Sequence, residues 1–199
     1  MPHPSQQLEP RRIRRTLPAK FALAAVATVG LASAGCGSSS SNGVSAAAYV
    51  KSVCGAAATW FESVQSVGGK LQAAVHTHKS LPQTKASYTT FVTGLLHATE
   101  RAEGQLKAAG TPAVNNGKQI SDSIVHAFSR AAHGLAGAAA AARKLPTTSS
   151  TAFRNAATRV QAQIQRSLAS LAAVAPQRNP QLRAAALKDP TCQHLRRLG

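Results

Sequence analysis

The stretch SAAAYVKSVCGAAATWFESVQSVGGKLQAAVHT, residues 45–77, decides the fold. Its apolar residues recur at alternating steps of four and three: Ala46, Val50, Val53, Ala57, Trp60, Val64, Val67, Leu71 and Ala74. This spacing places them on one side of an α-helix, and Ser45 is a suitable N-cap. Because the pattern keeps its phase across Gly68-Gly69, it predicts one helix from Ser45 to Thr77. The two glycines, each costing about 1 kcal/mol relative to Ala, leave a break there as the alternative.

The same rhythm returns three times further along the chain. Helical apolar stripes run through residues 88–109, 113–145 and 153–174, and shorter pieces follow at 180–187 and 190–198. Leu81-Pro82 is interpreted as the turn after the first helix, and Gly110, Pro146 and Pro176 as stop signals for the other three. Residues 45–199 are therefore predicted to form one all-α domain.

Long amphipathic helices joined by short connections pack beside their chain neighbours. The prediction is an antiparallel up-down-up-down four-helix bundle with a short C-terminal helical extension. Small residues from Gly134 to Ala142 let helix axes approach closely. Each small side chain buries little apolar area, at about 25 cal/mol per Å², so the predicted core is long and thin.

Residues 1–35 have the parts of an export signal. Positive charge precedes an apolar run of 12 residues, Phe21–Ala32, which Thr28 and Gly30 interrupt. A helix needs roughly 20 apolar residues to cross a bilayer, so the run predicts a signal that is recognised and removed. Residues 14–17, Arg-Arg-Thr-Leu, partly match a twin-arginine export signal, but an ordinary arginine-rich signal is the favoured interpretation.

The end of this leader, Leu31-Ala-Ser-Ala-Gly-Cys36-Gly37, resembles the signal peptide of bacterial lipoproteins. Ala34, Gly35 and Cys36 fit that pattern, whereas Ser33 stands where an aliphatic residue is commoner. The resemblance implies that Cys36 carries diacylglycerol, that residues 36–44 are a Gly/Ser tether, and that the protein lies at the outer face of the cytoplasmic membrane. Stable anchoring takes two or more acyl chains.

The resemblance is specific for residues 11–41 only. Beyond them the chain is similar in composition alone to small Ala-rich lipoproteins of high-GC Gram-positive (actinobacterial-type) bacteria, which implies no activity. The alternative is cleavage after Ala32-Ser33-Ala34 by ordinary signal peptidase, which would release a secreted soluble protein.

Three cysteines are present, at positions 36, 54 and 192. If Cys36 is lipidated, Cys54 and Cys192 can pair. In an up-down-up-down bundle, the start of the first helix and the end of the fourth lie at the same end, and disulfides persist in exported proteins. We therefore predict a Cys54–Cys192 disulfide, with two free buried cysteines as the alternative.

Basic residues dominate the charge, which is +17 for the whole chain. Residues 143–199 contain ten Lys and Arg residues and one acid, Asp189. This surplus favours contact with anionic lipid or cell-wall polymer, and the alternative is that it only confers solubility. Export and a scarcity of aromatic residues for base stacking argue against nucleic acid. Whether the protein has a protein partner is unknown from the sequence.

The remaining side chains predict neither an enzyme nor a metal or cofactor site. A ferritin-like di-iron site needs Glu-x-x-His on two helices, whereas His97-Ala-Thr-Glu100 has the reverse order and no counterpart. His126 and His133 share a helix face but are about 10.5 Å apart along the axis. No Gly-x-Ser-x-Gly, Ser-x-x-Lys or haem-attachment motif occurs, although haem binding by His97 or His126 stays open.

Two hypotheses of function follow. The first is a non-catalytic, lipid-anchored binding or structural module of the cell envelope with a basic surface. The second is a small-ligand or metal-binding sensor, exported as a released protein, with a cavity between its helices.

Overall fold

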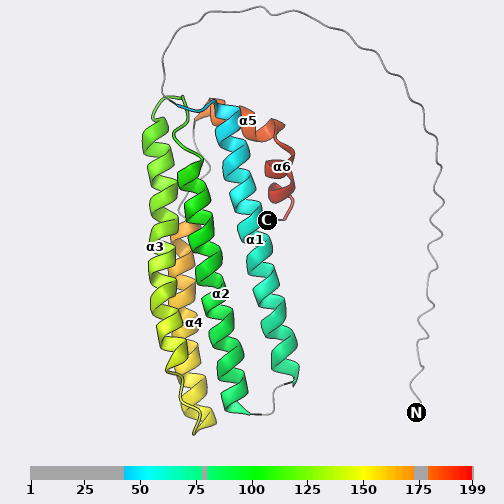
Figure 1. Ribbon diagram of the computed structural model, residues 1–199, viewed down its shortest axis with the longest axis vertical. Coiled ribbons are helices and arrows are strands. Elements are labelled where there is room, and N and C mark those ends of the chain that lie inside the picture. The colour runs from blue at the N-terminus through cyan, green and yellow to red at the C-terminus, as the bar shows by residue number, and fades with distance from the viewer. Residues whose placement is uncertain (1–42, 78–79, 173–178, 199) are drawn as a thin grey trace, which may run out of the picture. The chain divides into compact units, whose positions relative to one another are not determined.

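The computed structural model describes residues 43–77, 80–172 and 179–198, which form an all-α protein (Figure 1). Its helices are α1 (Ala46–Thr77), α2 (Leu81–Ala108), α3 (Gly117–Arg143), α4 (Ser150–Ala172), α5 (Pro180–Lys188) and α6 (Pro190–Arg196). The predicted signal peptide, Cys36 and most of the predicted tether lie outside the described residues. No helix in the described part is long and apolar enough to cross a membrane.

The first helix is continuous through Gly68-Gly69, so the alternative of a break there is wrong. Ser45 caps it as predicted, because its Oγ accepts a hydrogen bond of 3.2 Å from the Ala48 N–H. Leu81-Pro82 is not the turn that the sequence suggested. These residues begin α2 behind the N-cap Ser80, since proline is tolerated in a first helical turn, where its missing N–H has no partner to lose.

The third helix begins at Gly117, four residues later than the stripe from Ala113 predicted. Asn116 has a left-handed backbone with φ of 60°, which helical residues do not adopt. The preceding loop also pairs with the start of the described chain. Val44 N–H donates to the Thr111 carbonyl at 2.9 Å, and Ala113 N–H donates to the Val44 carbonyl at 2.8 Å. Val44 is therefore attached to the loop between α2 and α3.

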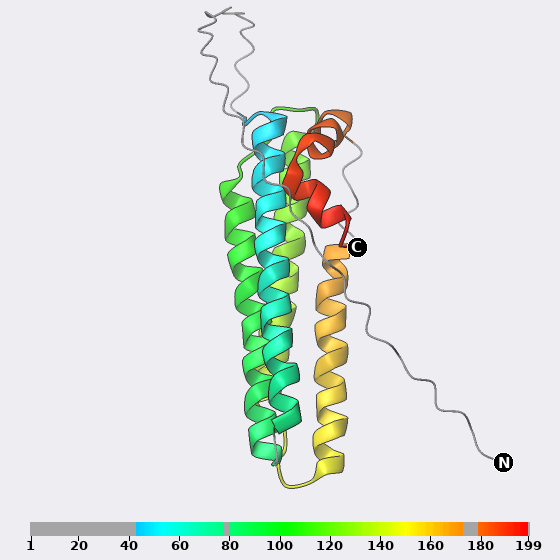
Figure 2. The same cartoon turned by 90° about the vertical axis from the view of Figure 1, so that its right-hand side faces the viewer.

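The four long helices lie side by side, and the close pairs are α1–α2, α2–α3 and α3–α4 (Figures 1 and 2). The short helices α5 and α6 pack on α1. This packing is consistent with a helix bundle that carries a short C-terminal extension.

The core consists of two clusters along the bundle. The first joins α2, α3 and α4 through Val92, Leu95, Leu135, Ala138, Ala139, Ala142, Leu145, Phe153, Val160 and Ile164. The second joins α1, α2 and α3 to α5 and α6 through Tyr49, Val50, Ala56, Leu106, Ala109, Ile124, Leu182 and Cys192. The buried residues of α4 belong to the first cluster, and those of α5 and α6 belong to the second. The C-terminal extension therefore contributes buried side chains to the part of the bundle in which α4 contributes none.

Small residues bring α3 and α4 close together, as the sequence predicted. Ala138, Ala139 and Ala142 are fully buried, and a Cβ on Gly134 would collide with Ser167 of α4. The approach lets α4 side chains reach α3 backbone carbonyls. Gln163 Nε2 donates to the Gly134 carbonyl at 3.3 Å, and Ser170 Oγ donates to the Ala127 carbonyl at 3.2 Å. These bonds fix how α4 is rotated against α3.

Candidate functional site

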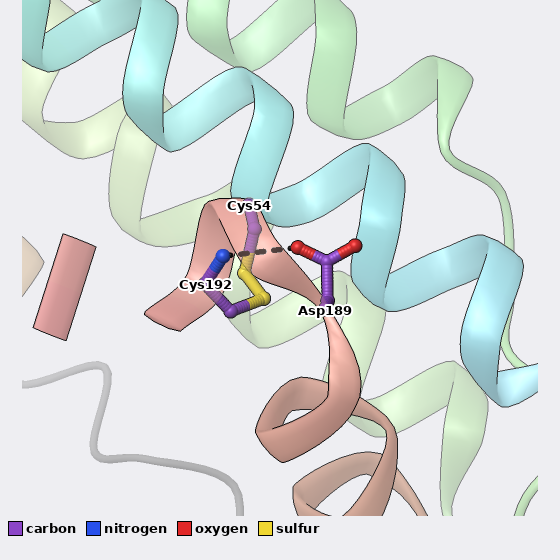
Figure 3. A group of neighbouring side chains, drawn as sticks. All are labelled: Cys54, Asp189 and Cys192. Atoms are coloured by element: carbon purple, nitrogen blue, oxygen red, sulfur yellow. Dashed lines mark hydrogen bonds between the residues drawn. A yellow bond between two sulfur atoms is a disulfide. The ribbon is translucent and has the colours of Figure 1, made fainter. Parts of the chain in front are cut away.

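A disulfide joins Cys54 of α1 to Cys192 of α6, as the sequence predicted (Figure 3). The two Cα atoms are 5.3 Å apart, although 138 positions separate the residues in the chain. Such Cα separations are usual for disulfides. Cys192 is buried in the second core cluster, so the bond fastens α6 to the first turns of α1.

Asp189 lies beside this disulfide and caps α6 (Figure 3). Its Oδ1 accepts a hydrogen bond of 2.9 Å from the Cys192 N–H. The two sulfur atoms and a carboxylate oxygen of Asp189 all lie within 4.8 Å of one another. Metal ions bind thiolates, and sulfurs bonded to each other are not thiolates. In the disulfide form the group therefore fastens the C-terminal extension to α1.

A cleft of about 440 Å³ lies where α4 meets the end of α3. It is lined by Ala141, Lys144, Leu145, Ala156, Arg159, Val160, Ala162, Gln163 and Arg166. Leu145 and Val160 are buried members of the first core cluster. Lys144, Arg159 and Arg166 are exposed. The lining thus combines apolar side chains of the core with three cations at the surface.

Gln163 orients the face of α4 that carries both arginines of this cleft. Arg159 lies four residues before Gln163 and Arg166 three residues after it, so all three share a face of α4. Because Gln163 donates to the Gly134 carbonyl of α3, that face is directed toward α3. Lys144 is the C-cap of α3: its N–H donates to the Ala141 carbonyl at 3.0 Å, and the Leu145 N–H donates to the Ala142 carbonyl at 3.2 Å. Three cations from two elements therefore surround one hollow.

None of these three cations takes part in an ion pair within the described residues. Acidic side chains pair elsewhere: Glu100 with His97 at 3.0 Å, Glu103 with Lys107 at 2.7 Å, and Asp122 with Lys118 at 2.6 Å. The sequence has no Asp or Glu between Asp122 and Asp189. The cleft is consequently a place of uncompensated positive charge.

Trp60, one of two adjacent aromatic residues of α1, contacts both α2 and α3. Trp60 Nε1 donates to the Thr99 Oγ1 of α2 at 3.2 Å, and its ring meets the edge of Phe128 on α3, with centroids 6.1 Å apart. Thr99 is buried and donates in turn to the Leu95 carbonyl at 2.9 Å. Trp60 is half-buried, as is the neighbouring Phe61, so the indole lies at the edge of the packed interior.

The histidines do not assemble a site within the described residues. His97 is exposed and bonds Glu100, and His126 and His133 are exposed on α3. Within the described residues, side chains of metal-ligating type cluster at Cys54, Asp189 and Cys192, and this cluster includes no histidine.

Comparison with protein-family models, curated proteins and solved structures found no match for this chain.

Proposed function

We propose that the protein is a non-catalytic, lipid-anchored module of the cell envelope, held at the outer face of the cytoplasmic membrane, whose basic surface binds an anionic envelope component. The disulfide carries the proposal. It accounts for Cys54 and Cys192, so Cys36 is the one cysteine left over. An odd cysteine in an exported protein needs a role, and lipidation after removal of residues 1–35 gives it one.

A short tether would keep the domain near the membrane. Val44 is bonded to the α2–α3 loop, so in this proposal the residues from Cys36 to this point span the distance from the acyl chains to the domain. Eight Gly/Ser-rich residues reach about 16 Å on average. The basic surface would then operate within reach of the lipid head groups.

The four long helices run alternately up and down in this proposal. Six residues, 144–149, connect α3 to α4, and they span at most about 20 Å. The 27 residues of α3 extend about 40 Å, so the connection is too short to return along it. The same reasoning applies to the eight residues between α2 and α3.

The distribution of ionisable side chains supports a binding role rather than a catalytic one. Catalysis by acid and base needs titratable groups positioned together. The lining of the basic cleft includes no Asp, Glu, His, Ser or Cys. Its lysine and arginines fit the recognition of an anion.

Fractionation of producing cells tests the proposal. The unaltered protein is expected in the membrane fraction, resistant to a high-salt wash and released by detergent, whereas Cys36→Ser is expected to lose this salt-resistant attachment. Cys54→Ser/Cys192→Ser is the matched control, because it also removes sulfur but leaves Cys36. Release of the unaltered protein by salt alone, or salt-resistant attachment of Cys36→Ser, would contradict the anchor.

A further inference from the structure

We propose that the cleft between α3 and α4 binds the head group of an anionic phospholipid. Lys144, Arg159 and Arg166 hold the phosphate, and the apolar lining receives the first carbons of the lipid. This inference rests on the proposed function, because a membrane anchor brings the domain to such lipids. It adds a defined site and a ligand class to a surface otherwise described only by its charge.

The charge of the cleft favours an anion. Three cations surround one hollow without an acidic partner in the described ion pairs. Asp122, the acid of α3, is 21 residues before Arg143, about 30 Å along the helix axis. Guanidinium groups bind phosphate oxygens through paired hydrogen bonds, and an ammonium group adds a point charge. A phosphate also relieves the repulsion among the three cations.

The apolar part of the cleft selects an amphiphile over a free phosphate. Ala141, Leu145, Ala156, Val160 and Ala162 form it, and a volume of about 440 Å³ lies in the range of small-ligand sites. Inorganic phosphate fills a fraction of that volume and gains nothing from alkyl side chains. A phosphoglycerol head group with the start of its acyl chains has both a charged end and an apolar end, so it matches both parts of the lining.

The position of the cleft fixes how the domain would lie. Val44 is attached to the loop before α3, whereas the cleft is at the far end of α3, about 36 Å further along the helix. Both the acyl chains on Cys36 and a lipid in the cleft belong to one membrane. The helix axes would therefore lie along the membrane surface, with the α3–α4 face turned toward the lipid.

Native mass spectrometry tests the site on the full chain extracted in a neutral detergent. The probes are dihexanoyl-phosphatidylglycerol, dihexanoyl-phosphatidylcholine with the same chains and no net charge, and inorganic phosphate without an apolar part. We expect phosphatidylglycerol to bind at least about tenfold more tightly than either of the others. One bound lipid per chain is the expected stoichiometry.

Matched variants locate the binding. Arg159→Gln/Arg166→Gln removes two cations of the cleft and is expected to weaken phosphatidylglycerol binding at least about tenfold. Arg154→Gln/Arg183→Gln removes the same charge outside the lining and is expected to change the affinity for phosphatidylglycerol less than about twofold. Ala162→Trp fills the cleft without changing the charge and is expected to abolish binding. Because Arg159 and Arg166 form no ion pair, their replacement leaves the fold intact, which circular dichroism checks.

Each other outcome overturns the inference in a different way. Equal weakening by both arginine pairs would mean diffuse attraction to a basic surface, and the proposed function would stand without this site. Phosphate binding as tight as that of phosphatidylglycerol would make the ligand a free anion. Undiminished binding by Ala162→Trp would place the lipid elsewhere. The lipid anchor itself is tested by a separate experiment, the membrane fractionation of Cys36→Ser.

Discussion

Removal of the disulfide by Cys54→Ala/Cys192→Ala is expected to destabilise the protein and to free its C-terminal helices first. The cross-link closes a loop between positions 138 apart. The chain-entropy relation assigns such a loop about 5 kcal/mol at 25 °C, and losses of 2–5 kcal/mol are typical when a native disulfide is removed. We therefore expect the free energy of unfolding to fall by about 2–5 kcal/mol.

The loss should not be uniform along the chain. The helices α5 and α6 pack on α1, and the buried residues that they contribute to the core are Leu182 and Cys192. Without the cross-link, few large buried side chains attach α5 and α6 to the bundle. The first cluster, which joins α2, α3 and α4, is unaffected. Local opening of residues 180–196 should then precede global unfolding.

Urea denaturation followed by circular dichroism measures the global effect, and hydrogen exchange with mass spectrometry measures the local one. The unaltered protein treated with reductant is the control, because it loses the bond but keeps both sulfur atoms. A fall below about 1 kcal/mol would refute the entropic reasoning. Exchange in residues 180–196 as slow as in α2 would refute the ordering of events.

Three further predictions concern particular side chains. Thr99→Val should cost about 1–3 kcal/mol in urea denaturation, because it leaves the Trp60 N–H unpaired, whereas the exposed Thr158→Val should cost less than about 0.5 kcal/mol. Gly134→Ala should lower the free energy of unfolding by about 1–3 kcal/mol, because its Cβ collides with Ser167. Gly104→Ala, whose Cβ meets open space, should raise it by about 0.5–1 kcal/mol. Equal effects of the two substitutions would contradict the close approach of α3 and α4. Burial raises the pKa of Tyr49 to about 12, above its unfolded value of 10.0, so its contribution to stability is complete below pH 10 and lost as the pH rises toward 12. Tyr49→Phe should be less sensitive to that rise than the unaltered protein. Burial also raises the pKa of Tyr88, so absorbance at 295 nm should show both tyrosines ionising later than free tyrosine, with Tyr49 the last.

The helices and the disulfide were predictable because both follow from residue spacing. The four-and-three rhythm of α1 persists through Gly68-Gly69, and the packing of its apolar side against α2 outweighs the glycines. The pairing of Cys54 with Cys192 followed from the expected helix number and connection lengths, together with export and the assignment of Cys36 to a lipid. The order and spacing of residues along the chain are enough to predict both features.

The helix starts and the cleft were harder to predict because they depend on contacts between segments. Leu81-Pro82 begins a helix because Ser80 caps it, and Asn116 delays α3 because its backbone is left-handed. The basic C-terminal third is visible in the sequence, whereas the cleft is not. The spacing of Arg159, Gln163 and Arg166, with no acid between Asp122 and Asp189, was the available signal. Their direction toward α3 depends on the Gln163–Gly134 hydrogen bond, which no local pattern contains.

The proposed anchor depends on lipid at Cys36, while the disulfide joins the other two cysteines. Intact mass spectrometry of the native protein extracted from membranes, unreduced and reduced, tests it most directly. We expect residues 36–199 with a diacylglycerol adduct, and a gain of two hydrogens on reduction. A chain that starts at Gly35 without lipid, or a mass that reduction does not change, would contradict it.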